Sequence, residues 1–174
     1  MVATGRSDDS TNDVPITGDA GDPSDPAAAD SGGGKLAAEA ATTSSTLIGS
    51  SGNDQLEGNR GADILSAMAD NDTNKAGNGS DTPFGGDGDD ILNGGAGTDL
   101  FVFHSGFGQD TVTEFNASAD HIELAIGLYD NFQDLQPHMQ QVGQDVVTTI
   151  SDAEAVTLQK VTLADLDPND FTIF

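Results

Sequence analysis

Residues 85–102 read GGDGDDILNGGAGTDLFV and contain two consecutive copies of one nine-residue pattern. Each copy has glycine at its first, second and fourth positions, aspartate at its sixth, and apolar residues near its end. Glycine permits the positive φ angles of tight turns, and the apolar residues after the aspartate favour a short strand. A fixed period of this length is typical of a repeat architecture in which each unit stacks on others.

The same period extends upstream without insertion or deletion. It divides the preceding sequence into four further blocks, 49–57, 58–66, 67–75 and 76–84. The sixth position is aspartate in all six blocks: Asp54, Asp63, Asp72, Asp81, Asp90 and Asp99. Six aspartates in one register identify the period as a structural repeat.

Each block combines a glycine-rich turn with a three-residue strand, which predicts an all-β fold. Two blocks would make one turn of a right-handed parallel β-roll (β-helix), with one strand on each face. The eighth position would point inward, and its residues are Leu56, Leu65, Asn74, Pro83, Leu92 and Phe101. Leucine and phenylalanine at four of the six positions would supply the core of the roll.

Stacking blocks that are two apart predicts calcium sites between the layers. Stacked strands lie ~4.8 Å apart, and calcium takes six to eight oxygens at ~2.3–2.6 Å. An ion between two turns would therefore reach carboxylate and carbonyl oxygens of both layers, whereas magnesium at ~2.1 Å fits poorly. Without ions, each edge would carry a row of like charges, so we expect calcium binding and folding to be coupled. Six blocks predict about four calcium ions, two on each edge.

Blocks 85–93 and 94–102 resemble, without mismatch, the nonapeptide of RTX (repeats-in-toxin) calcium-binding proteins. In that family the turn carbonyls and the sixth-position aspartate bind calcium. The resemblance implies that the best-matched ligands are Gly85, Gly86, Gly88, Asp90, Gly94, Gly95, Gly97 and Asp99. Asp54, Asp63, Asp72 and Asp81 complete the predicted set, although Ser50 and Asn59 replace the second glycine of the first two blocks.

The blocks 67–75 and 76–84 depart from this pattern. The first of them has AMAD in place of the turn glycines, and both have a non-aliphatic residue at the inward position. We expect the coil to continue there, but to be locally weak and incompletely occupied by calcium. An alternative is an EF-hand-like loop formed by Asp70, Asp72, Asn74, Asn78 and Asp81. That alternative is disfavoured because Lys75 stands where such a loop requires glycine.

Residues 1–46 have few large aliphatic side chains, several prolines and an excess of acids. This composition predicts a disordered acidic leader or linker, with a conditionally ordered binding segment as the alternative. The domain boundaries that follow are 47–102 for the β-roll and 103–174 for a C-terminal region.

The C-terminal region loses the period and predicts a β-sandwich-like cap with one short helix. The predicted helix covers 132–142, with Asn131 or Asp130 as its N-cap, Pro137 near its start and Gly143 at its end. The predicted strands are 100–103, 111–115, 121–126, 145–150, 155–158 and 161–163. Asp110, Glu114 and Asp120 either hold a further calcium ion or face solvent, and solvent is favoured.

Segments 101–124, 132–147 and 161–174 resemble the C-terminal domain that follows RTX repeats in serralysin-type proteases and mannuronan C5-epimerase R-modules. The final residues, 170–174, are similar to the uncleaved C-terminal signal of type I secretion in that family. The resemblance implies export by a type I secretion apparatus to an extracellular location. There, millimolar calcium would fold a chain that remains extended in the cytosol.

Composition excludes several classes of partner and chemistry. The chain has 174 residues, with 30 acidic against 5 basic residues and a formal net charge of −25. Binding to nucleic acid or insertion into a membrane is therefore not expected. There is no cysteine, which excludes disulfides and thiolate sites, and the first ten residues lack the apolar stretch of a secretory signal peptide.

No catalytic constellation is visible. His104, His121 and His138 lack metal-ligand spacing, and no nucleophile or phosphate-binding motif is present. We therefore expect a non-catalytic, monomeric, secreted calcium-binding module, associated with acidic exopolysaccharide or a cell surface. The alternatives are an accessory module or small form of a glycan-modifying or proteolytic enzyme, and a calcium-dependent adhesin.

Overall fold

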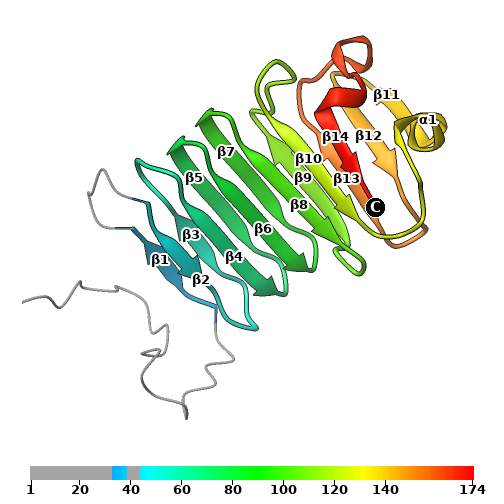
Figure 1. Ribbon diagram of the computed structural model, residues 1–174. Helices are drawn as coiled ribbons and strands as arrows, with labels where there is room; N and C mark the ends of the chain where they lie inside the picture. The colour runs from blue at the N-terminus through cyan, green and yellow to red at the C-terminus, as the bar shows by residue number, and fades with distance from the viewer. Residues whose placement is uncertain (1–32, 39–43) are drawn as a thin grey trace, which may run out of the picture.

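The computed structural model describes residues 33–38 and 44–174, which wind into a parallel β-roll with a thicker C-terminal end (Figure 1). One face is an eight-stranded sheet ordered β1-β3-β5-β7-β9-β13-β12-β11, and the other consists of the sheets β2-β4-β6 and β8-β10-β14. The strands of the eight-stranded sheet are β1 (Lys35–Ala37), β3 (Gln55–Glu57), β5 (Thr73–Gly79), β7 (Ile91–Gly97), β9 (Gln109–Thr113), β13 (Ala155–Leu158), β12 (Asp145–Thr149) and β11 (Met139–Val142). The strands of the other face are β2 (Thr46–Ile48), β4 (Ile64–Ala69), β6 (Thr82–Asp87), β8 (Leu100–His104), β10 (His121–Ala125) and β14 (Phe171–Ile173).

Strand register confirms that two nonapeptides make one turn of the coil. Gln55 lies opposite Thr73, and Thr73 lies opposite Ile91. The other face repeats the same step, because Ile64 of β4 lies opposite Thr82 of β6. Blocks that are two apart therefore stack directly on one another, as the period predicts.

The coil extends beyond both predicted limits of the roll. Upstream, β1 pairs in parallel with β3, so the prediction of disorder across 1–46 is wrong for Lys35–Ala37. It is also wrong for Thr46, which begins β2 and pairs with Ile64 of β4, while residues 1–32 and 39–43 of that predicted leader lie outside the described residues. Downstream, β9 and β10 continue the parallel stacking on β7 and β8. The predicted boundary at residues 102 and 103 thus falls within a continuous coil.

The eighth position of every block is buried, including Asn74 and Pro83 of the two departing blocks. Asn74 is fully buried and its Nδ2 donates a hydrogen bond to the carbonyl oxygen of Phe84 at 2.7 Å. The departing blocks contribute β5 and β6, with seven and six residues, whereas β3 has three. The coil therefore continues through 67–84 with longer strands than in the first block.

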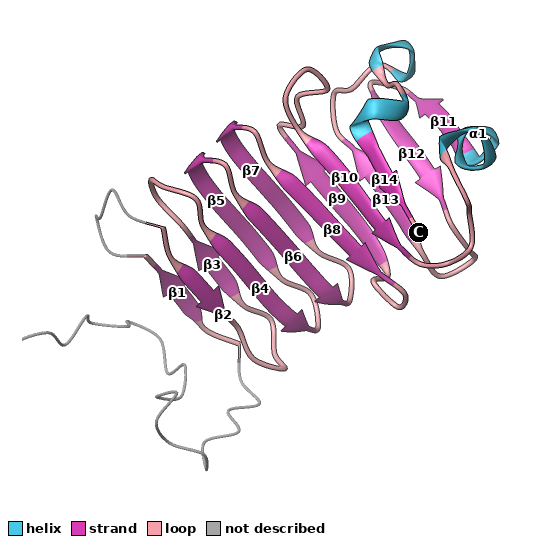
Figure 2. Cartoon of the chain, viewed as in Figure 1, coloured by secondary structure: helices cyan, strands magenta, loops and turns pink. Residues whose placement is uncertain are grey.

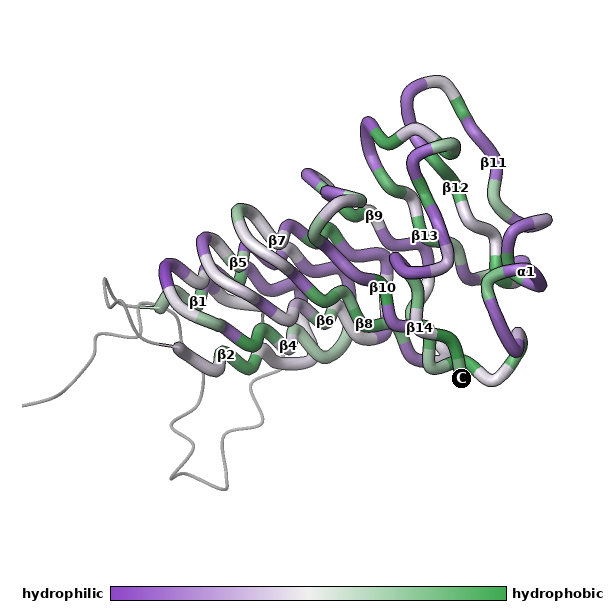
Figure 3. Tube along the Cα trace, turned by 45° about the horizontal axis from the view of Figure 1, so that its top comes forward, coloured by the Kyte–Doolittle hydropathy of each residue, from purple (hydrophilic) through white to green (hydrophobic). Residues whose placement is uncertain are grey.

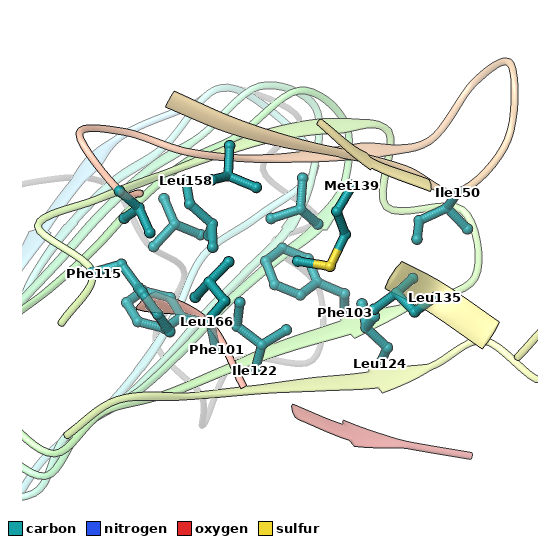
Figure 4. Packing of buried hydrophobic residues seen from close by; sticks show 14 of the residues in the cluster. Phe101, Phe103, Phe115, Ile122, Leu124, Leu135, Met139, Ile150, Leu158 and Leu166 are labelled. Atoms are coloured by element: carbon teal, nitrogen blue, oxygen red, sulfur yellow. The ribbon is translucent and has the colours of Figure 1, made fainter. Parts of the chain in front are cut away.

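The core divides into a thin aliphatic part and a thick aromatic part. Under the first turns lie Leu36, Leu56, Leu65, Ala67 and Ala76. At the C-terminal end, Phe101, Phe103, Phe115, Ile122, Leu124, Leu135, Met139, Ile150, Leu158 and Leu166 point into one space between the sheets (Figure 4). Apolar burial is the main source of stability in small domains, so the C-terminal end has the larger share of it.

The C-terminal end differs in detail from the predicted cap. The helix α1 spans only Phe132–Leu135, followed by a 3₁₀ turn at Gln136–His138 and then β11. Asn131 is the N-cap, as predicted, and its side chain accepts hydrogen bonds from two backbone N–H groups. Pro137 lacks an N–H group and so cannot continue an α-helix as a 132–142 helix would require.

Other segments of this end add strands to the existing sheets rather than forming a separate sandwich. β13 pairs in parallel with β9, and β14 pairs in parallel with β10. The predicted strand at 161–163 is wrong, since Leu163–Asp165 forms a 3₁₀ turn. The helical turns lie together at the far end of the coil (Figure 2). No helix among the described residues is long and apolar enough to cross a membrane.

Candidate metal centre

Aspartates of stacked blocks meet at the turns on both edges of the coil. Hydrophilic residues recur from layer to layer along the trace (Figure 3). The sixth-position aspartates are each at most 3% exposed: Asp54, Asp63, Asp72, Asp81, Asp90 and Asp99. Their burial follows from the fold, because each stands between the turn and the strand of its block and faces the block stacked on it. Buried carboxylates require hydrogen bonds or a cation.

On one edge, aspartates two blocks apart are joined by backbone hydrogen bonds. Oδ1 of Asp72 accepts from the N–H of Asp54 at 2.6 Å, and Oδ1 of Asp90 accepts from the N–H of Asp72 at 2.7 Å. The chain of bonds continues beyond the repeats, where Oδ1 of Asp110 accepts from the N–H of Asp90 at 2.9 Å. We call Asp54, Asp72, Asp90 and Asp110 the first ladder.

The opposite edge repeats this arrangement. Oδ1 of Asp81 accepts from the N–H of Asp63 at 2.7 Å, and Oδ1 of Asp99 accepts from the N–H of Asp81 at 2.9 Å. Oδ1 of Asp120 accepts from the N–H of Asp99 at 3.0 Å. Asp63, Asp81, Asp99 and Asp120 form the second ladder.

Asp110 and Asp120 were missed by the strict period of nine. They are 1% and 2% exposed, so the prediction that they face solvent is wrong, whereas Glu114 is exposed and accepts from Nδ2 of Asn93 at 3.2 Å. The signal for Asp110 is SGFGQDTVT at 105–113, which repeats the glycine and aspartate pattern after a two-residue insertion. A search that allowed insertions would have found it.

Five carboxylates in the ladders carry a buried oxygen without a hydrogen-bond partner. Within the described residues, these are the Oδ2 atoms of Asp72, Asp81, Asp90, Asp99 and Asp110. Burial raises the pKa of Asp110 to about 8 and the pKa of Asp72 to about 7. Burial likewise raises the pKa values of Asp90 and Asp99 to about 6. These oxygens therefore require either a proton or a cation.

The turn glycines leave space that a side chain would fill. A Cβ atom on Gly85 or Gly94 would overlap Oδ2 of the aspartate five residues later. Gly86 and Gly95 lie against the carbonyl oxygens of Met68 and Gly77 in the layer below. The fourth-position glycines Gly88 and Gly97 lie in the same way against the carbonyls of Asp70 and Gly79. All eight of the best-matched predicted residues thus occupy turns that bring carboxylate and carbonyl oxygens together.

Comparison with known proteins agrees with this geometry. Residues 42–73 and 75–112 match the family model of the RTX calcium-binding nonapeptide repeat, in four copies. These are RTX calcium-binding repeats. No curated protein sequence matches the chain.

Three solved structures resemble the RTX coil. The extracellular lipase LipA from Serratia marcescens is 27% identical, with a TM-score of 0.51 over 79% of this chain. The chain spans only 21% of LipA. The R3 subunit of the Azotobacter vinelandii mannuronan C5-epimerase AlgE6 is 22% identical, with a TM-score of 0.47, covering 81% of this chain and 77% of that one. Its R2 subunit is 24% identical, with a TM-score of 0.42, covering 87% and 96% respectively.

The departing RTX block 67–75 keeps the turn conformation despite its sequence. Met68 and Asp70 adopt φ angles of 89° and 69°, which are positive, as they are for Gly86 and Gly88 in the block stacked on it. The EF-hand alternative is wrong, because Asp72 belongs to the first ladder and Asp81 to the second, on opposite edges of the coil. Asp70 is exposed.

The donor set of the RTX turns suits a hard cation that prefers oxygen. Within 33–38 and 44–174, no group of three or more His, Cys, Asp or Glu side chains is placed to hold a metal. A site between two turns would therefore combine two aspartates with backbone carbonyls, which are the oxygen ligands that calcium takes. The three histidines are exposed, and His104 and His138 contact the rings of Phe84 and Tyr129.

Proposed function

We propose that this chain is a non-catalytic module whose RTX coil binds calcium ions between stacked turns and folds as it binds them. The observation that carries the proposal is the set of five buried Oδ2 atoms without a partner. The proposed ligands are these sixth-position carboxylates together with carbonyl oxygens of the turns. The turns that match the family best, at 85–90 and 94–99, contribute Gly85, Gly86, Gly88, Gly94, Gly95 and Gly97 to this set.

Charge supports the coupling of binding to folding. The formal net charge is −25, and both ladders bring carboxylates of the same sign within one layer of each other. Among the described residues, the aliphatic core beneath the first turns contains five buried side chains. Each divalent ion would neutralise two charges at the point of closest approach, so removing the ions would leave the repulsion with little apolar burial to oppose it.

A titration of the chelated protein tests this function. Circular dichroism should gain β signal on adding millimolar calcium as the repeat turns fold, while the same concentration of magnesium should leave the spectrum unchanged. Isothermal titration calorimetry on the same sample should report saturable calcium binding. An absence of calcium binding at millimolar concentration would refute the proposal.

We extend the proposal to export by a type I secretion apparatus. Residues 170–174 are its signal, and the extracellular LipA gives a precedent for this coil outside the cell. In the folded protein, Phe171–Ile173 pairs with β10, so recognition of the signal would have to precede folding. Co-expression with a type I exporter should place the full chain in the medium, and removal of 170–174 should retain it in the cell. Equal export of both would contradict this extension.

A further inference from the structure

The carboxylates of the first two blocks differ from those that follow. Oδ2 of Asp54 accepts hydrogen bonds from the backbone N–H of Ser50 at 2.5 Å and from its hydroxyl at 3.0 Å. Oδ2 of Asp63 accepts from the backbone N–H of Asn59 at 3.1 Å. Both oxygens of these two aspartates are therefore already hydrogen-bonded, unlike the five with an unpartnered Oδ2.

The second residue of the block explains this difference. Where the aspartate has an unpartnered oxygen, that residue has a positive φ: 89° at Met68, 112° at Gly77, 114° at Gly86, 91° at Gly95 and 96° at Gly106. Ser50 and Asn59 stand at the same position and are not among the described residues with a positive φ. A positive φ reorients the N–H group relative to the following chain, so it no longer faces the carboxylate four residues later. Serine and asparagine avoid this conformation more than glycine does.

A bound N–H group competes with a cation for the same oxygen. It places a partial positive charge at hydrogen-bond distance from the carboxylate and so weakens the attraction of that oxygen for calcium. A carboxylate that accepts backbone hydrogen bonds at both oxygens is stabilised in its charged form without an ion. Backbone N–H groups of the first two blocks thus already compensate the charges of Asp54 and Asp63.

We propose that calcium binds only where both stacked carboxylates have an unpartnered oxygen, an inference that rests on the calcium function proposed above. Three gaps meet this condition: between Asp72 and Asp90, between Asp90 and Asp110, and between Asp81 and Asp99. The ion-binding part of the coil is therefore shifted toward the C-terminus. It includes the departing blocks 67–84, which the sequence predicts to be weakly occupied.

One of these three sites lies beyond the six regular nonapeptides. The turn at 105–110 has Gly106 and Gly108 with φ angles of 96° and 81°. A Cβ atom on Gly108 would overlap the carbonyl oxygen of Gly88 in the layer below. At the fourth position of the turn, the gap between Asp90 and Asp110 therefore places a carbonyl oxygen beside two carboxylates, as the gap between Asp72 and Asp90 does. By contrast, Oδ2 of Asp120 accepts from the N–H of Asn116 at 2.9 Å, which excludes the last gap of the second ladder.

Counting bound calcium in matched variants of the full chain tests the inference. Asp110 and Asp54 both belong to the first ladder. In Asp110→Asn and Asp54→Asn, the asparagine keeps an oxygen that can accept the backbone N–H hydrogen bond of the aspartate it replaces. Native mass spectrometry at saturating calcium should show three ions on the unmodified chain and on Asp54→Asn, and two on Asp110→Asn. Equal loss from the two variants, or an unmodified chain with a fourth ion that Asp54→Asn removes, would overturn the inference.

The reverse substitution provides a second readout that does not depend on removing a carboxylate. Asn59→Gly restores the glycine of the repeat and allows the N–H group to turn away from Asp63. It should add one ion, in the gap between Asp63 and Asp81, and an unchanged count would contradict the explanation. Absence of any bound calcium on the unmodified chain would instead refute the proposed function itself, so the two failures are distinguishable.

Discussion

The two ends of this coil share parallel strand stacking but differ in what stabilises them. From β1 to β7 the interior is narrow and aliphatic, and its edges carry buried carboxylates. From β8 to β14 the interior holds a large cluster with phenylalanines at its centre. If the proposed calcium sites are filled, the comparison teaches that one backbone architecture draws its stability from cations in one half and from apolar burial in the other.

The largest effect of a single substitution is expected at the aromatic end. Phe103 is 1% exposed and packs against Phe107 with ring centroids 5.1 Å apart. Phe103→Ala should lower the free energy of unfolding by ~3–5 kcal/mol, with and without calcium, because it leaves a cavity in the core. Urea unfolding under both conditions measures this. A loss seen only in calcium would break the proposed division between the two ends.

A smaller effect, on calcium-dependent folding alone, is expected from a substitution in a turn of the repeat end. Gly85→Ala would place a methyl group against Oδ2 of Asp90 and should raise the calcium midpoint of folding about tenfold, equivalent to ~1.4 kcal/mol. Gly34→Ala is the matched control, because its Cβ atom would make only ordinary contact at 3.9 Å with Oδ1 of Asp54. Calcium titrations of the two variants that coincide would contradict the role of the first-position glycine.

The change in Tm between two pH values should differ by a few degrees between calcium-free and calcium-bound protein. Burial raises the folded-state pKa values of Asp72, Asp90, Asp99 and Asp110 from 3.8 to between about 6 and about 8. A raised pKa means that the folded state holds its protons more tightly than the unfolded state. The stabilisation that comes from this proton binding is complete below pH 3.8, and it disappears as the pH rises through the folded-state pKa values. Calcium-free protein should therefore melt at a higher temperature at pH 5 than at pH 8.

Calcium should cancel or reverse that trend, because the ion replaces the proton and binds more tightly when the carboxylates are ionised. Thermal melts by circular dichroism at both pH values, with chelator and with calcium, provide the four curves. A chelated protein that is more stable at pH 8 would show that these oxygens are compensated by something other than protons.

The smallest effect is expected at the surface of the repeat end. Nζ of Lys35 lies 2.9 Å from Oε2 of Glu57, and both side chains are more than one-third exposed. Lys35→Met should lower the free energy of unfolding by only ~0.2–1 kcal/mol, and by less at high salt. Urea unfolding at two salt concentrations checks this, and a larger effect would mean that β1 contributes more to the coil than its three residues suggest.

How much could be predicted depends on whether local chemistry or long-range contacts set each feature. The period of nine predicts the stacking, the inward positions and both ladders up to Asp99, because each block carries its own turn and strand signals. Asp110 and Asp120 were missed since an insertion of two residues, and then one of a single residue, interrupt the period. β1 was missed because the single short stretch KLA has no periodic neighbour, and its strand state depends on pairing with β3.

Substituted turns show a second limit of the pattern. Met68 departs from glycine and yet keeps a positive φ, whereas Ser50 and Asn59 depart and do not. Departure from glycine at this position therefore does not by itself exclude a positive φ, because the layers stacked on a turn also constrain its backbone. The prediction of a helix over 132–142 was wrong for a local reason, namely Pro137. How far Pro137 shortens the helix depends on the strand that follows it.

Amide hydrogen exchange of the full chain, compared in calcium and in chelator, tests the central claim most directly. With calcium, the amides of β5 and β7 should be protected to a similar degree as those of β12 and β13. With chelator, β5 and β7 should lose their protection while β12 and β13 retain most of theirs, because the aromatic core does not depend on the ions. Equal protection of β5 and β7 in both conditions would contradict the account.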